Sequence, residues 1–155
     1  MSNQCKVQVG DRVRFSKTVA ETDVYSFAGI TGDFSQNHID EEYMRQSNFG
    51  RRVAHGALLV GFMSTTSTMM IAKSVAEGIS ATPVSLGYDR IRFVGPVYFG
   101  DTVTVDYTIS AVDQAQDRSF ANIEIKNQVG ETVAIGKHII KWVANPGSAT
   151  AQSET

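Results

Sequence analysis

The segment from Val53 to about Ala76 limits the possible folds more than any other part of this 155-residue chain. Apolar residues occur on nearly every side of a helix drawn through its first half, and such a helix must be buried on most sides. His55, a run of hydroxyl residues at 64–68 and Lys73 interrupt the segment. A bilayer-spanning helix needs about 20 mainly apolar residues. The segment therefore predicts a core helix and no membrane partner.

Downstream of this helix the apolar period changes from 3.6 to 2, which is the spacing of half-buried β-strands. Strands are predicted at 86–93, 102–110, 120–126 and 132–142, and an extended stretch precedes the helix at 6–19. Short connections make the later strands antiparallel neighbours. The sheet needs a cover for its apolar face, and the helix needs burial. One antiparallel sheet wrapped around one long central helix, an α+β fold, satisfies both.

Between the first extended stretch and the long helix the pattern predicts short helices and loops. A helix that begins at Glu21 or Thr22 should end at Gly32. Residues 32–40 are polar and are expected to be irregular, and Asp40 is the predicted N-cap of a second short helix. Residues 1–143 are expected to form one domain. Residues 144–155 have no hydrophobic pattern and are predicted to be a disordered tail.

Charge and cysteine content exclude several classes of protein. The net charge of −2 gives no general attraction to nucleic acid or to acidic lipids. Cys5 is the only cysteine, so neither an intrachain disulfide nor a cysteine metal cluster is possible. The first nine residues are too polar for a secretory signal. The expected compartment is therefore the cytoplasm.

Asp33 and His38 are the residues that point to chemistry. On a continuous helix, side chains five residues apart would point about 140° apart, so they can converge only across a loop. Gly32 and the polar residues 35–37 favour such a loop. A carboxylate beside an imidazole is an acid/base pair near neutral pH. The alternative is that Asp33 caps a turn and His38 is a surface residue or a satisfied core residue.

Three blocks of sequence, in order, resemble the MaoC-like dehydratases and (R)-specific enoyl-CoA hydratases, which have the hot-dog fold. The residues 27–40, Phe-Ala-Gly-Ile-Thr-Gly-Asp-Phe-Ser-Gln-Asn-His-Ile-Asp, resemble the hydratase-2 motif. Residues 49–58 resemble the segment that leads into the central helix, and residues 92–102 resemble a strand with Pro-Val and Gly-Asp. The resemblance extends from about Val9 to Trp142. It departs from the family pattern at Ser35 and Gln36, where the family has Asn and Pro.

The resemblance implies a reaction and a set of roles. Asp33 and His38 would hold one water, which adds to a trans-2-enoyl thioester to give an (R)-3-hydroxyacyl thioester. Gly56 would offer its backbone N–H to the thioester carbonyl. No metal and no redox cofactor is implied, because coenzyme A or acyl carrier protein enters as part of the substrate. The family also implies a homodimer or a higher homo-oligomer.

Five further residues are candidates for substrate contacts. Ser35 stands where the family has its orienting Asn, and Asn37 can take over that role. His55 either lines the site or packs at the start of the helix. Arg51 and Arg52 either meet the phosphates of coenzyme A or form a solvated basic loop.

Two other functions compete with the hydratase. A hot-dog thioesterase would need a carboxylate on or near the central helix, and no Asp or Glu occurs between His55 and Glu77. A non-catalytic acyl-thioester-binding protein would have no need of an acid/base pair. Loss of turnover with retained thioester binding in Asp33→Ala would separate an enzyme from a binding protein.

Overall fold

The computed structural model describes residues 5–76, 78 and 81–146. Its elements, in chain order, are β1 (Arg12–Thr18), α1 (Glu21–Thr31), α2 (Gln36–Ile39), α3 (Glu41–Arg45), α4 (Gly56–Val75), β2 (Ala81–Phe93), β3 (Thr102–Asp113), β4 (Arg118–Lys126) and β5 (Thr132–Ala144). The strands form one antiparallel sheet in the order β1-β3-β4-β5-β2. The predicted α+β class and the hot-dog arrangement of sheet and helix are confirmed.

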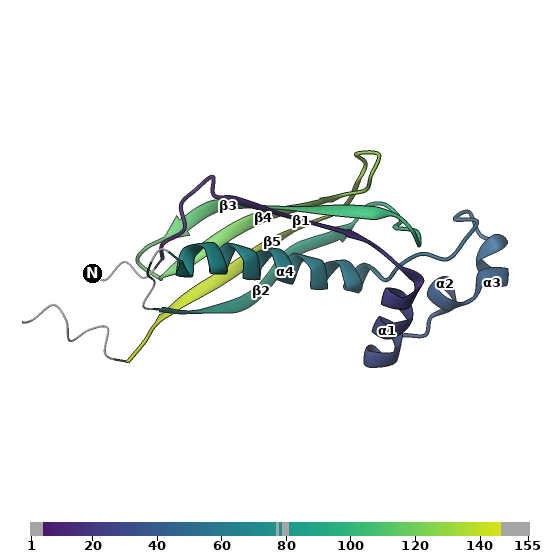
Figure 1. Cartoon of the computed structure of the whole chain (residues 1–155), viewed down its shortest axis with the longest axis horizontal. Helices are drawn as coiled ribbons and strands as arrows, with labels where there is room; N and C mark the ends of the chain where they lie inside the picture. The colour runs from purple at the N-terminus through teal and green to yellow at the C-terminus, as the bar shows by residue number, and fades with distance from the viewer. Residues whose placement is uncertain (1–4, 77, 79–80, 147–155) are drawn as a thin grey trace, which may run out of the picture.

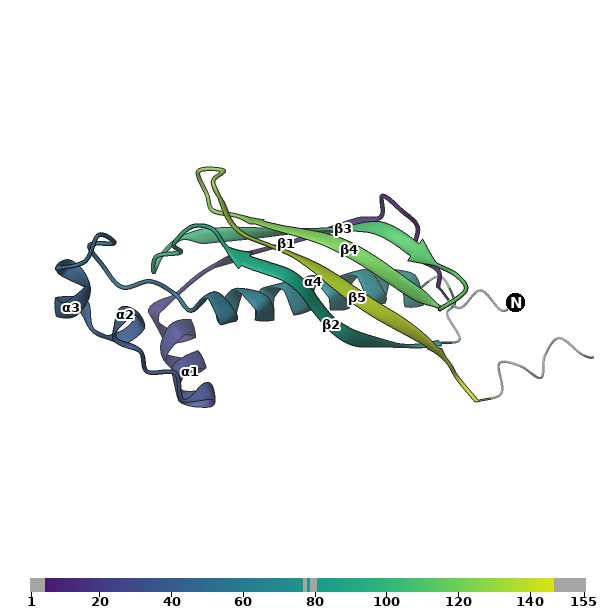
Figure 2. The ribbon, with the colours of Figure 1, turned by 180° about the vertical axis from the view of Figure 1, so that it is seen from behind.

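The long helix α4 lies along the concave face of the sheet, which curves over it (Figures 1 and 2). Its buried face packs mainly against β1 and β3, where Phe62 contacts Phe15 with ring centroids 6.1 Å apart. Met63 and Met70 are fully buried on the same helix. Among the described residues, α4 is the one helix with the length and hydropathy of a membrane span. Its place against the sheet is that of a core helix.

One face of α4 remains exposed in the isolated protomer, although the sequence predicted burial on most sides. Its exposed residues include small or weakly polar ones, Ala57, Gly61, Ser64, Thr65 and Thr68, and also the apolar Met69 and Val75. The sheet of one protomer therefore buries only part of the surface of this apolar helix.

The edge strand β2 differs from the inner strands in its exposure. Residues of β3 alternate between buried and partly buried up to Ile109, as expected for a strand with one face in the core. In β2 most residues are exposed, among them Val84 and Leu86 at 43% and 50%. Its pairing with β5 shifts register between Asp89 and Arg92. The protomer thus ends at an apolar edge on this side.

Short helices α1, α2 and α3 form a cluster beyond the end of the sheet at which α4 begins (Figure 1). Gly32 ends α1 with φ +81° and donates its N–H to the carbonyl of Ala28, as predicted. The carboxylate of Asp40 accepts the N–H of Tyr43 at 2.9 Å, so the predicted N-cap of α3 is also confirmed. The expectation that all of 32–40 is irregular was wrong, because α2 forms one helical turn within it.

Three predicted boundaries also need correction. The helix α4 begins at Gly56 and not at Val53, because Val53 is extended in a β-bridge with Tyr98. Strand β2 begins at Ala81, five residues before the predicted start, and it includes Pro83, which an edge strand tolerates. The predicted tail begins too early, since Ala144 belongs to β5. Residues 147–155 of that tail lie outside the described residues.

Candidate active site

Asp33, His38 and His55 meet at the end of the sheet where α4 begins. One ligand atom from each, a carboxylate oxygen or a ring nitrogen, lies within 4.8 Å of the other two. Asp33 follows the left-handed Gly32, His38 lies in α2, and His55 is the N-cap of α4. The loop at 33–35 and the single turn of α2 together bring the two sequence-predicted acid/base residues into one site.

The ring of His38 has one nitrogen engaged by the backbone. Its Nδ1 lies 2.7 Å from the carbonyl oxygen of Val53. A carbonyl can only accept, so Nδ1 carries the hydrogen and Nε2 of the neutral ring presents a lone pair. The side chain is buried, and this burial lowers the pKa of His38 from its usual value. His38 is therefore neutral, and basic at Nε2, near pH 7.

Asp33 is exposed in the protomer, and both its backbone and its carboxylate have defined partners. The N–H of Ser35 donates to a carboxylate oxygen of Asp33 at 3.3 Å. The backbone carbonyl of Asp33 accepts from Nε2 of His55 at 2.9 Å. The carboxylate is thus held at the surface of the site, where a substrate or a water can reach it.

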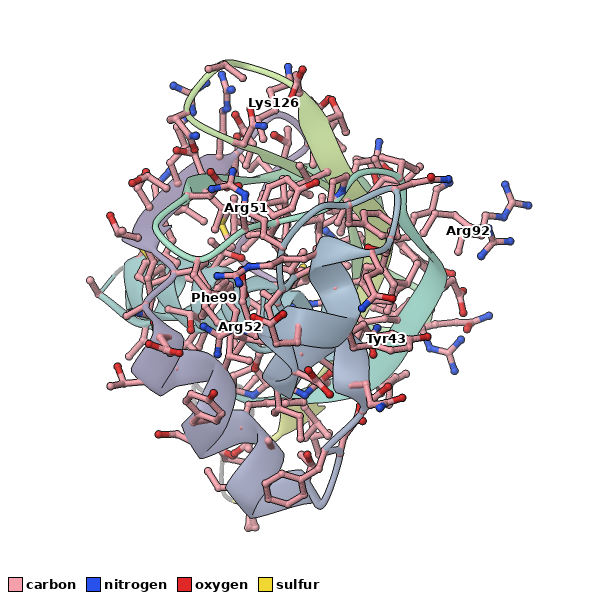
Figure 3. All side chains as sticks on the ribbon, turned by 90° about the vertical axis from the view of Figure 1, so that its right-hand side faces the viewer. Tyr43, Arg51, Arg52, Arg92, Phe99 and Lys126 are labelled. Atoms are coloured by element: carbon pink, nitrogen blue, oxygen red, sulfur yellow. The ribbon has the colours of Figure 1, made fainter. Side chains whose placement is uncertain are left out.

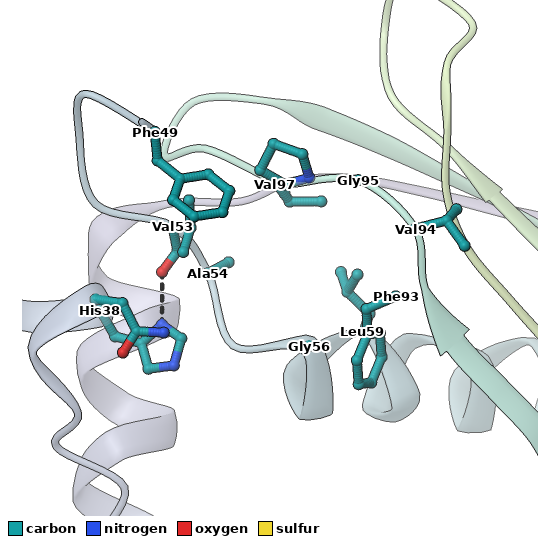
Figure 4. A pocket seen from close by; sticks show the side chains of 12 residues that line it. His38, Phe49, Val53, Ala54, Gly56, Leu59, Phe93, Val94, Gly95 and Val97 are labelled. Carbon is teal, nitrogen blue, oxygen red and sulfur yellow. Dashed lines mark hydrogen bonds between the residues drawn. The ribbon is translucent and has the colours of Figure 1, made fainter. Parts of the chain in front are cut away.

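A pocket of about 450 Å³ opens beside His38, as Figure 4 shows. Its walls come from the loop at 49–54, the first turn of α4 and the segment 93–97. Gly56 lies in this wall, and a Cβ placed on Gly56 would be only 2.5 Å from Cδ2 of Phe93. The first N–H groups of a helix have no intrahelical partner and lie at the positive end of its dipole. The pocket therefore combines an apolar wall, a basic nitrogen and backbone donors.

A model of one protein family, the MaoC-like domain, matches residues 5–133, which is most of the chain. The chain belongs to the MaoC-like family. An (R)-specific enoyl-CoA hydratase of Rhodospirillum rubrum is 32% identical over 68% of each chain. A 3-hydroxybutyryl-CoA dehydratase of Methylorubrum extorquens is 29% identical over 87% of this chain and 80% of its own length. The solved (R)-hydratase of Aeromonas caviae shares 26% identity, with a TM-score of 0.74, over 87% of this chain and 96% of the other.

The two departures from the MaoC-like motif lie between the acid and the base, Ser35 on the loop and Gln36 at the first position of α2. The hydroxyl of Ser35 donates to the side-chain oxygen of Asn37. The backbone carbonyl of Asn37 in turn accepts the N–H of Val53 at 3.0 Å. Ser35 and Asn37 thus tie the loop to the segment that leads into α4, and Asn37 also lines the pocket.

The two arginines before α4 have different surroundings (Figure 3). Arg52 forms ion pairs with Glu21 at 2.7 Å and Glu41 at 2.8 Å, and its guanidinium lies 4.8 Å from the centroid of the Phe99 ring. Arg51 is exposed, with its guanidinium 4.1 Å from the centroid of the Tyr98 ring. The internal ion pairs of Arg52 leave Arg51 as the arginine of this pair that is open to an anionic ligand.

The Asp33–His38–His55 group contains the residue types of a metal site, but its geometry suits acid/base chemistry better. The rings of His38 and His55 are stacked, with centroids 3.7 Å apart and planes 29° apart. The lone pairs of an imidazole lie in the ring plane, and those of two stacked rings do not converge on one ion. Coordination of one metal ion by a nitrogen of His38 and a nitrogen of His55 would require at least one of the two rings to leave the stack.

Two contributors to the MaoC-like site were missed by sequence reasoning. The carbonyl of Val53 selects the tautomer of His38, and a backbone carbonyl leaves no mark in a sequence. Phe93 covers Gly56, and it was passed over although it lies in the third block of the resemblance. A large aromatic residue at the end of a strand, two residues before Gly95-Pro96, was the available signal.

Proposed function

We propose that this protein adds water to trans-2-enoyl thioesters to give (R)-3-hydroxyacyl thioesters, and that it catalyses the reverse dehydration. The observation that carries the proposal is the approach of Asp33 to His38 beside a pocket that also contains Gly56. Membership of the MaoC-like family and the names of the relatives support the same reaction class.

One water held between Asp33 and His38 would supply both the hydroxyl and the proton. Nε2 of His38 accepts a proton as the water oxygen bonds to C3 of the enoyl group. A proton passes through the Asp33–His38 pair to C2, on the same face, so that the whole water molecule is added. The neutral state of His38 near pH 7 suits it to begin this sequence as a base.

Negative charge develops on the thioester oxygen as C3 is attacked. The N–H of Gly56, at the first helical position of α4, would stabilise that charge by a hydrogen bond and by the helix dipole. Loss of one such donor typically slows an enzyme about 100- to 1000-fold. The absence of a side chain on Gly56 lets the Phe93 ring pack directly against this position of the helix.

The carrier would be coenzyme A or acyl carrier protein, and Arg51 is the residue that we assign to its phosphates. Arg52 would act instead as an internal clamp between α1 and α3, through Glu21 and Glu41. Ser35 and Asn37 would orient the loop that carries Asp33. No metal or redox cofactor enters the proposed reaction. We place the protein in the cytoplasm, as one domain that extends to the end of β5 at Ala144.

The functional unit would be a homodimer or a higher oligomer. The edge of β2 exposes Val84 and Leu86, and the open face of α4 lies on the concave side of the same sheet. Exposed strand edges pair readily with another chain. Pairing of β2 with β2 of a second protomer would bury the apolar side chains of this edge. The second protomer would also cover the exposed face of α4.

The test is the hydration of crotonyl-CoA, followed by loss of the enoyl-thioester absorbance, with chiral analysis of the product. We expect turnover to the (R)-3-hydroxy product by the wild type. Asp33→Asn and His38→Gln, which preserve size, should each reduce turnover about 100-fold or more, within the range for general acid–base catalysis. Binding of the thioester, measured by calorimetry, should persist in both variants.

Other outcomes would identify the competing functions. Binding without turnover by the wild type, on short, long and branched enoyl thioesters, would indicate a binding protein. Release of free thiol from a saturated acyl-CoA would indicate a thioesterase, for which α4 supplies no carboxylate. Turnover that survives both substitutions would refute the assignment of the acid/base pair.

A further inference from the structure

The side chain of His55 contacts both residues of the proposed acid/base pair. The centroid of its ring lies 3.7 Å from that of His38 and 4.8 Å from that of Phe27. Its Nε2 bonds to the backbone of Asp33, and the next residue in the chain is Gly56. With 1% exposure, the side chain is sealed from solvent.

The hydrogen bond to Asp33 defines the tautomer of His55. The carbonyl of Asp33 can only accept, so the hydrogen of the neutral ring is on Nε2. Nδ1 is then a lone pair, and it is buried without a hydrogen-bond partner. A buried, unpaired acceptor opposes folding. A residue present only for packing could be an apolar ring, which has no such unfavourable group, so the donor to Asp33 is the feature that requires histidine.

Stacking restrains the charge state of the pair. If both rings were protonated, two positive charges would lie 3.7 Å apart in a buried place. The titratable groups that act on His38 are Asp33, which favours its charged form, and His55, which disfavours it. The stack therefore disfavours a state in which both rings carry a charge.

We propose that His55 is a positioning residue for the acid/base pair. Its Nε2–H holds the backbone of Asp33, and its ring face supports His38, so that carboxylate and imidazole converge on one water. The inference rests on the proposed hydration, but its structural half can be tested without any activity.

The activity-independent test is nitrogen-15 NMR of the imidazole rings. The chain has only three histidines, and replacing each by glutamine in turn assigns the signals. We expect Nε2 of His55 to carry a hydrogen, and the hydrogen of the His38 ring to be on Nδ1. A His55 ring with hydrogen on Nδ1 and none on Nε2 would overturn the proposal whether or not the protein hydrates enoyl thioesters.

Two substitutions separate the hydrogen bond from the ring. His55→Phe keeps an aromatic face for His38 but loses the donor to Asp33. We expect its kcat on crotonyl-CoA to fall about 10- to 100-fold, with KM changed by less than about threefold, because a misplaced catalytic group costs rate. His55→Gln keeps an N–H donor for Asp33 and loses the stacked ring. We expect it to retain kcat within about threefold at its optimum and to move the acidic limb of the pH–rate profile to higher pH.

Thermal unfolding of each variant shows whether it is folded. If His55→Phe does not fold, the NMR experiment and the kinetics of His55→Gln still test the proposal. Near-wild-type kcat in a folded His55→Phe would overturn it. So would an equal loss of kcat in both variants with an unchanged pH profile, which is the result for a residue that only supports packing. Absence of hydration by the wild type would instead refute the proposed function.

Discussion

Acidification should destabilise this protein through His138, a buried histidine outside the active site. Its Nδ1 lies 2.9 Å from the hydroxyl of Tyr107, its Nε2 lies 2.7 Å from that of Ser85, and Tyr88 stacks on its ring at 4.3 Å between centroids. The side chain is 1% exposed. Burial in this sealed place lowers the pKa of His138 from 6.5 to about 4.

The sign and the size of the effect follow from that difference. Between pH 6.5 and about 4 the unfolded chain binds a proton at His138 that the folded chain excludes. The free energy of unfolding therefore falls as the pH decreases through this window. The difference between the two pKa values lowers the free energy of unfolding by about 3 kcal/mol when the pH is below both of them. Between pH 7.5 and pH 5 the expected decrease is about 2 kcal/mol. His38, whose pKa is also lowered, acts in the same direction.

Urea unfolding at pH 7.5 and at pH 5, with protein concentration held constant, measures this loss. His138→Gln is the matched variant, because its amide can bond to both hydroxyl groups but does not titrate. The variant should lose about 2 kcal/mol less than the wild type over this pH range. An equal loss in the two proteins would refute the reasoning that His138 is held neutral by its burial.

Three further predictions concern the site and its supports. Gln36→Pro should raise the free energy of unfolding by about 0.4–1 kcal/mol in the same urea assay. Gln36 is the first residue of α2, and Ser35 already has the extended conformation that precedes proline. A lower free energy of unfolding than that of the wild type would show that the turn needs the N–H of Gln36. Gly56→Ala should reduce kcat/KM for crotonyl-CoA at least about tenfold, because its Cβ would meet the Phe93 ring and force the ring or the helix to shift. Adding Phe93→Ala to the same chain should recover part of the lost kcat/KM. No recovery would contradict the contact between position 56 and Phe93. Asp40→Ala should cost about 1 kcal/mol of stability by removing the cap of α3, with Glu42→Ala, on the same helix but exposed, as the nearly neutral control.

Local patterns in the sequence were sufficient for much of the fold. The 3.6-residue period of α4 and the two-residue period of β3 each depend on burial of one element against the core. Gly32 and Asp40 were correctly predicted to bound their helices, because their effects act within a few residues along the chain. These interactions are short in range, so a single sequence carries them.

Asp33 and His38 were proposed as the acid/base pair from their resemblance to a family motif, and their convergence depended on contacts distant in sequence. The Val53–Tyr98 bridge keeps Val53 extended and moves the start of α4 to Gly56. That shift places His55 at the N-cap, against His38. The helical period of the segment continued through these residues and gave no sign of the bridge.

The sequence by itself determined the order of the elements, because the helical and strand periods depend on residue type and local spacing. It also supplied the proposal of Asp33 and His38 as the acid/base pair, through their resemblance to a family motif. Tertiary structure alone decided the charge partners and the tautomers. Arg52 is held by Glu21 and Glu41, and His38 is oriented by the carbonyl of Val53. The physical reason is that a hydrogen bond or an ion pair acts over about 3 Å, and only the folded backbone brings residues 11 to 31 positions apart within that distance.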